Sequence, residues 1–128
     1  MDPITLQMAP MARRIAEQVI AIKPTEQVLI ITDAERPPTI TQALLSAFGA
    51  VAGETILLTM KARPMGGVEP PPIVAAAMLA ADAIVFQTSY ATFHTNAARA
   101  AMAKGVRVCD MWGVDEDMML RGGLSADH

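Results

Sequence analysis

Residues 27–32 constrain the fold most, because four consecutive apolar side chains, three of them β-branched, lie at the centre of this short segment. Alternating apolar and polar residues would indicate a strand with one face in water. An unbroken apolar run is typical of a strand that helices cover on both faces. Strands of this kind belong to parallel sheets, whose connections cross over through helices. The segment therefore favours an α/β fold.

Helical and strand patterns alternate along the rest of the chain. Further strands are predicted at residues 55–60, 83–87 and 106–110. This alternation predicts one α/β domain over residues 1–128, a three-layer Rossmann-like domain with a four-stranded, or slightly larger, parallel sheet. Because the first crossover and the later ones are expected to wind in opposite directions, the predicted strand order is 2-1-3-4.

Four helices and a final helical turn are predicted between and after these strands. The first covers residues 8–22 and ends at Lys23-Pro24, since proline disfavours helical geometry in the residue before it. The second begins at Pro37-Pro38, the third covers residues 73–81, and the fourth ends at Gly105. A last helical turn is predicted at residues 115–121. The expected buried stripe of the first helix consists of Met8, Met11, Ile15, Val19 and Ile22.

Charge and cysteine content exclude several classes of function. The formal net charge is −3 and no basic cluster occurs, which argues against nucleic-acid binding. Cys109 is the single cysteine, so neither an internal disulfide nor a cysteine-based zinc site is expected. The longest apolar run, residues 73–81, is too short to cross a membrane, and the N-terminus does not resemble a signal peptide. We therefore expect a cytoplasmic protein.

Candidate ligand-binding residues follow the carboxyl ends of the predicted strands, where open parallel sheets bind their ligands. The loop at residues 88–95 is the richest in hydrogen-bonding groups and leads into a helix N-terminus, which favours an anion. Thr92 or Thr95 could equally serve only as the helix cap. The candidates are Asp33, Arg36, Thr88, Ser89, Tyr90, His94 and Thr95.

The same loops lack the residues of a self-sufficient active site. No glycine follows the first strand where a nucleotide pyrophosphate would need one. His94 is the only internal histidine, and potential metal ligands are not clustered. Ser89 and His94 could be drawn as a triad with Asp33 or Asp110, but Ser89 lacks the context of a nucleophile elbow. We expect no catalytic residue, metal site or cofactor in this chain.

Apolar residues after the fourth strand form a candidate interface. Methionine and tryptophan are enriched at interface cores, which favours contact with a further domain or a second subunit. The alternative is that these residues fold back onto the domain's own core. The candidates are Met111, Trp112, Met118, Met119 and Leu120.

A resemblance to a known family is carried by residues 26–33, 69–72, 80–85, 92–95, 98–101, 104–108 and 116–121. These segments resemble the N-terminal domain of the aminopeptidase T-like metalloenzymes, which are often labelled leucyl aminopeptidases. The related 2,5-dihydroxypyridine 5,6-dioxygenases share this architecture. Members of the family are longer and hold a divalent metal in a C-terminal domain, so the resemblance implies no catalytic residue here.

The resemblance implies that the chain is the N-terminal part of a two-domain metalloenzyme. The leading hypothesis is a substrate-positioning, dimer-forming domain of a metal-dependent aminopeptidase-like hydrolase, with the C-terminal metal domain or a second subunit as partner. The first alternative is the same domain in a ferrous ring-cleaving dioxygenase. The second is a stand-alone α/β ligand-binding or subunit protein.

Overall fold

Four parallel strands form the central sheet of the computed structural model, which describes residues 2–125, with side chains as far as Arg121. The order β2-β1-β3-β4 and the parallel pairing confirm the predicted fold class and topology. Each strand begins and ends within one residue of its predicted bounds. The strands are β1 (Gln27–Asp33), β2 (Glu54–Met60), β3 (Ala83–Gln87) and β4 (Arg107–Asp110).

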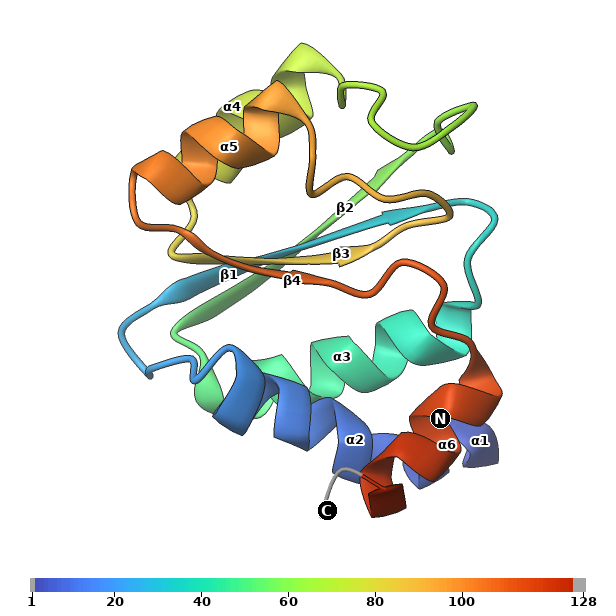
Figure 1. Ribbon diagram of the computed structural model, residues 1–128. Coiled ribbons are helices and arrows are strands. Elements are labelled where there is room, and N and C mark those ends of the chain that lie inside the picture. Colours follow the sequence, from blue (N-terminus) through green and yellow to red (C-terminus); the bar gives the residue numbers. More distant parts are fainter. Residues whose placement is uncertain (1, 126–128) are drawn as a thin grey trace.

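Helices cover both faces of the sheet, as Figure 1 shows. One layer contains α4 (Pro72–Ala80) and α5 (Asn96–Ala103). The opposite layer contains α1 (Pro3–Gln7), α2 (Ala9–Arg14), α3 (Pro38–Val51) and α6 (Glu116–Ser125), with α6 packed against α2 and α3. No helix of the described residues combines the length and apolarity that a membrane crossing needs.

The two central strands, β1 and β3, separate two hydrophobic cores. Val28 and Ile30 of β1 pack in the core beneath α2, α3 and α6. Leu29 and Ile31 point to the other face and pack in the core beneath α4 and α5. Because successive strand residues face opposite sides, both layers need apolar partners from the same strand. This explains the unbroken apolar run that predicted the fold.

The first helical segment differs from its prediction at Val19. After α2 the chain continues as a π-helix (Ile15–Val19), in which the Ile20 amide donates to the Ile15 carbonyl at 2.9 Å. This wider turn rotates the following residues, so Ile20 is buried while Val19 is 58% exposed. The helical segment also ends at Val19, before the predicted end at Lys23-Pro24, and Ala21 just after it has φ +52°. The prediction for Val19 was wrong because it assumed a uniform period of 3.6 residues.

Two glycines shape the turns that lead into strands. A Cβ atom at Gly53 would lie 2.6 Å from the carbonyl oxygen of Pro24, so only glycine lets β2 begin beside the loop before β1. Gly105 has φ +93° and ends α5, as predicted. These turns align the amino ends of neighbouring strands and leave the longer loops at the carboxyl edge.

The candidate interface after β4 divides into buried and exposed residues. Met111 and Met119 are buried in the domain's own core, and Leu120 packs against it. Trp112 is 55% exposed and Met118 is 50% exposed. Met111, Met119 and Leu120 thus pack inward, as the fold-back alternative proposed. Trp112 and Met118 stay exposed, and their contact with a partner stays a prediction. The helix there is longer than predicted, since α6 reaches Ser125.

Candidate functional site

Asp33 and Ser89 connect the carboxyl ends of the two central strands. Asp33 is the last residue of β1 and is 3% exposed. It accepts hydrogen bonds from the Ser89 amide at 2.7 Å, the Ser89 hydroxyl at 2.8 Å and the Glu35 amide at 3.0 Å. The carboxylate is therefore fully engaged within the protein. A role for Asp33 and Ser89 in ligand binding stays a prediction.

The Asp33–Ser89 contact also bears on the triad that the sequence allowed. A triad requires a histidine between the hydroxyl and the carboxylate. Here the Ser89 hydroxyl donates directly to Asp33, and the His94 side chain is exposed. The geometry in the described chain does not form a triad at Ser89.

The loop at residues 88–95 is held together by its own threonines. The Thr88 hydroxyl donates to the Tyr90 carbonyl at 2.8 Å and lies 3.2 Å from the Thr92 hydroxyl. Thr95 is buried and caps α5, because its hydroxyl oxygen accepts from the Ala98 amide at 3.1 Å. These hydroxyl groups shape the loop, and the capping role that the sequence allowed for Thr95 is confirmed.

Glu69 occupies the N-terminus of α5, where we expected an anion to bind free amides. Its carboxylate oxygens accept from the Asn96 amide at 2.7 Å and from the Ala97 amide at 3.0 Å. Glu69 lies in the loop between β2 and α4, so the chain itself supplies the anion. The expectation of free amide groups at this helix was wrong, because sequence reasoning did not place Glu69 near α5.

Exposed aromatic side chains gather on the loops after β3 and β4. Asp110 accepts from the Phe93 amide at 3.3 Å and from the Trp112 amide at 2.9 Å, which ties the two loops together. The rings of Phe93 and His94 meet edge to face, with centroids 5.5 Å apart. Tyr90 is 45% exposed. The candidates Tyr90 and His94 are thus available to solvent, whereas Thr88 and Thr95 are buried.

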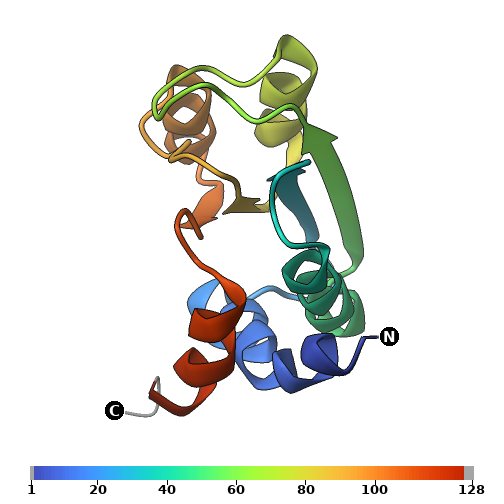
Figure 2. The ribbon, with the colours of Figure 1, turned by 90° about the vertical axis from the view of Figure 1, so that its right-hand side faces the viewer.

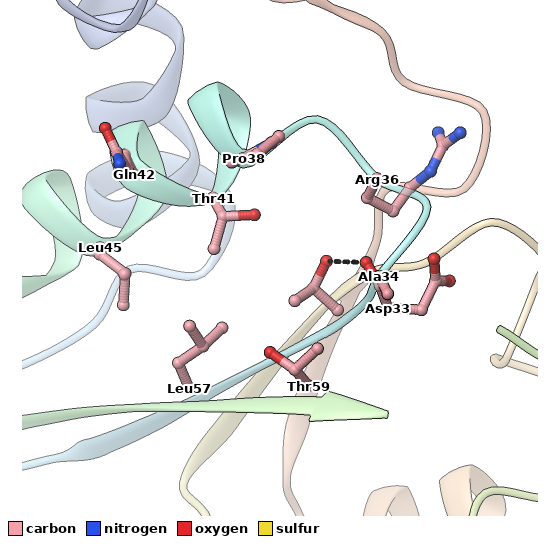
Figure 3. A pocket seen from close by; sticks show the side chains of 10 residues that line it. Asp33, Ala34, Arg36, Pro38, Thr41, Gln42, Leu45, Leu57 and Thr59 are labelled. Carbon is pink, nitrogen blue, oxygen red and sulfur yellow. Dashed lines mark hydrogen bonds between the residues drawn. The ribbon is translucent and has the colours of Figure 1, made fainter. Parts of the chain in front are cut away.

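A pocket of about 370 Å³ lies between α3 and the carboxyl ends of β1 and β2 (Figure 3). Its walls carry both hydroxyl groups and aliphatic side chains. In Figure 3 the Asp33 carboxylate and the Arg36 guanidinium extend away from the centre of the cavity. Within the described residues the buried Nε of Arg36 has no hydrogen-bond partner. The lining residues include Thr32, Arg36, Thr41, Leu45, Leu57 and Thr59.

Sequence reasoning found only part of this pocket. It selected Asp33 and Arg36 but not Thr41, Leu57 or Thr59. The Thr41 hydroxyl donates to the side-chain oxygen of Gln87 at 2.6 Å, and this hydrogen bond positions Thr41. The predicted order 2-1-3-4 could have indicated Leu57 and Thr59. It places the second strand at the edge of the sheet, beside the first strand that carries Asp33.

The described part of the chain does not offer a metal site. No group of three or more histidine, cysteine, aspartate or glutamate side chains lies close enough to hold an ion. Burial, and to a lesser extent the nearby Asp110 charge, raises the pKa of the Cys109 thiol. A raised pKa keeps this thiol protonated and weakly nucleophilic. The carboxyl edge instead presents a pocket, exposed aromatic rings and loops held in place by hydrogen bonds.

Comparison with known proteins identifies a shared fold. No family model matches the chain, and no curated protein sequence matches it. Among solved structures, the 2,5-dihydroxypyridine dioxygenase from Pseudomonas putida KT2440 is similar over 84% of this chain, with a TM-score of 0.65 and 14% sequence identity. The chain spans about a third of that protein's length, since the match covers 34% of it. At this identity the likeness shows the α/β fold.

Proposed function

We propose that this chain is the substrate-positioning domain of a larger, two-domain enzyme of the ring-cleaving dioxygenase type. The observation that carries the proposal is the fold shared with part of a 2,5-dihydroxypyridine dioxygenase over most of this chain. The leading hypothesis from the sequence was an aminopeptidase-like hydrolase, which no comparison supports. The dioxygenase alternative therefore takes its place.

In this proposal the loops at the carboxyl edge form one wall of the substrate cleft. Tyr90 and His94 are exposed there, and aromatic rings pack well against a planar ring. The described residues do not suit a metal ion, so the metal of such an enzyme would be held outside them. The chain's contribution is to bind and orient the substrate, which lowers KM more than it raises kcat.

The test uses the protein encoded by the complete reading frame that contains this chain. Ferrous-dependent oxygen consumption is measured with 2,5-dihydroxypyridine. We expect His94→Ala and Tyr90→Ala to raise KM several-fold and to change kcat less. Thr25→Ala, an exposed position at the opposite edge of the sheet, is the matched control and leaves both constants unchanged. Absence of oxygen consumption by the complete protein would contradict the proposal.

The pocket beside β1 and β2 favours a second candidate, a stand-alone ligand-binding domain. Its volume of about 370 Å³ falls within the usual size range of small-molecule sites. This candidate predicts that the 128-residue chain alone binds a small ligand, detected as a rise in Tm. It also predicts that Thr59→Trp, which would fill part of the pocket, abolishes that rise. Substrate turnover that requires a further domain would favour the first candidate.

A further inference from the structure

The strand β2 lies at the edge of the sheet and has no partner strand on its outer side within the described residues. In the described chain β1 pairs with one side of β2 along its whole length, and no strand pairs with the other side. Figure 2 shows β2 as the outermost strand of the sheet. Proteins that leave such an edge free usually protect it with charges or prolines. Residues 55–59 contain neither.

Both faces of β2 also leave apolar side chains in water. Ile56 is 44% exposed and Leu57 is 36% exposed. Leu57 lines the pocket beside α3, while Ile56 and Leu58 line a second hollow of about 150 Å³ next to Ala77 of α4. Neither helical layer therefore covers the edge strand completely. Removing these side chains from water would favour a partner that brings both a strand and apolar surface.

We propose that β2 pairs antiparallel with β2 of a second copy of this chain, around a two-fold axis perpendicular to the sheet. The two four-stranded sheets then join into one continuous sheet. A two-fold contact uses the same surface on both copies, so the aliphatic centre of β2 meets its own copy. Pairing of backbone edges supplies the hydrogen bonds that the outer side of β2 lacks.

Charges at the two ends of β2 favour the antiparallel direction. Glu54 begins the strand, Lys61 follows its last residue, and both are exposed. In an antiparallel pair, the end of β2 that carries Glu54 lies beside the end that Lys61 follows in the other copy, so each end of the contact carries opposite charges. A parallel pair would bring two Glu54 side chains together, which is unfavourable.

The resulting dimer keeps the loops at residues 88–95 open and lies beside the pocket wall that Leu57 forms. Antiparallel pairing turns the carboxyl edges of the two sheets in opposite directions, so the loops at residues 88–95 face solvent at opposite ends. Trp112 and Met118 follow β4, at the other side of the sheet, and lie outside this contact. The proposal is thus independent of the leading proposed function and places the dimer contact elsewhere than the residues that the sequence suggested.

The first experiment measures the self-association of the 128-residue chain by sedimentation velocity over a range of concentrations. We expect a dimer, and we expect Ile56→Lys and Leu57→Lys each to raise its dissociation constant at least about tenfold. Met118→Lys is the control, because Met118 is 50% exposed on α6, which follows β4 at the other side of the sheet. Circular dichroism and Tm establish that each variant is folded.

The second experiment tests the direction of pairing by charge reversal. Glu54→Lys and Lys61→Glu should each weaken the dimer, most strongly at low salt, and the double variant should restore it. A monomeric wild-type chain at several hundred micromolar would overturn the proposal. So would a dimer that resists both lysine substitutions in β2 but dissociates in Trp112→Ala. A double variant as weak as the single ones would overturn the antiparallel arrangement.

Discussion

The Asp33 carboxylate at the end of β1 accepts two hydrogen bonds from Ser89, one from its amide and one from its hydroxyl, at 2.7 and 2.8 Å. The strands β1 and β3 are neighbours in the sheet. The chain winds away from them in opposite directions, which in α/β proteins opens a crevice for ligands. Here the Asp33–Ser89 contact bridges that crevice and holds the following loop to the sheet.

Replacing Asp33 should therefore destabilise the whole domain. In Asp33→Asn an amide group replaces one carboxylate oxygen, so a buried donor would face a donor of Ser89 or Glu35. We expect the free energy of unfolding to fall by about 1–3 kcal/mol, as measured by urea denaturation. Glu35→Gln, at an exposed neighbouring position, is the control and should change it by less than about 0.5 kcal/mol. Equal stability of the two variants would contradict this role for Asp33.

Removing the Glu69 side chain should uncover an anion site at α5. Glu69→Ala leaves the Asn96 and Ala97 amides to water, and we expect a loss of about 0.5–1 kcal/mol in stability. Sulfate should then raise the Tm of this variant more than that of the wild-type chain, because it can replace the carboxylate. Glu35→Ala serves as the control for general effects of charge. An equal response to sulfate in all three proteins would disprove the capping role of Glu69.

The ion pair between Glu26 and Arg107 predicts how stability depends on pH. Two hydrogen bonds, of 2.8 and 3.0 Å, join the carboxylate to the guanidinium. The hydrogen bonding with Arg107 lowers the pKa of Glu26 from 4.5 to about 2, although burial opposes it. Because the folded pKa lies below the unfolded one, the pair stabilises the protein above pH 4.5. This contribution is lost as the pH falls toward 2.

A series of urea denaturations between pH 2.5 and 6 measures this dependence. The wild-type chain should lose stability relative to Glu26→Gln as the pH falls, because only the wild-type side chain takes up a proton on unfolding. Glu17→Gln, at an exposed position, should follow the wild-type profile. Parallel curves for the wild-type chain and Glu26→Gln would show that the pair does not stabilise the fold.

Adjacent methionines on α6 offer a matched test of how this helix packs. Met119 is 1% exposed and lies in the core, whereas its neighbour Met118 is 50% exposed. Met119→Asp would bury an unpaired carboxylate, so we expect a loss of about 3 kcal/mol or more in the free energy of unfolding. Met118→Asp should stay within about 0.5 kcal/mol of the wild-type value. Similar losses in both variants would mean that α6 packs in another orientation.

The sequence by itself determined the layered architecture of this protein. The apolar run at residues 27–32 predicted a strand buried on both faces, and the alternation with helical patterns predicted the parallel sheet and its order. Gly105 marked the end of α5 correctly. These features depend on local periodicity and backbone freedom, which are properties of neighbouring residues and can be read in order along the chain.

Only the tertiary structure decided which polar groups meet and which apolar groups stay exposed. Asp33 and Ser89 are 56 residues apart, and Glu69 lies 27 residues before Asn96. A carboxylate can accept from amides, hydroxyl groups and charged side chains alike, so its residue type does not reveal its partner. After the π-helical turn, Ile20 is buried in place of Val19, and this depends on the packing of whole layers. The burial of Met119 rather than Met118 depends on it in the same way. Contacts between distant segments follow from the fold, and the fold alone supplies their geometry.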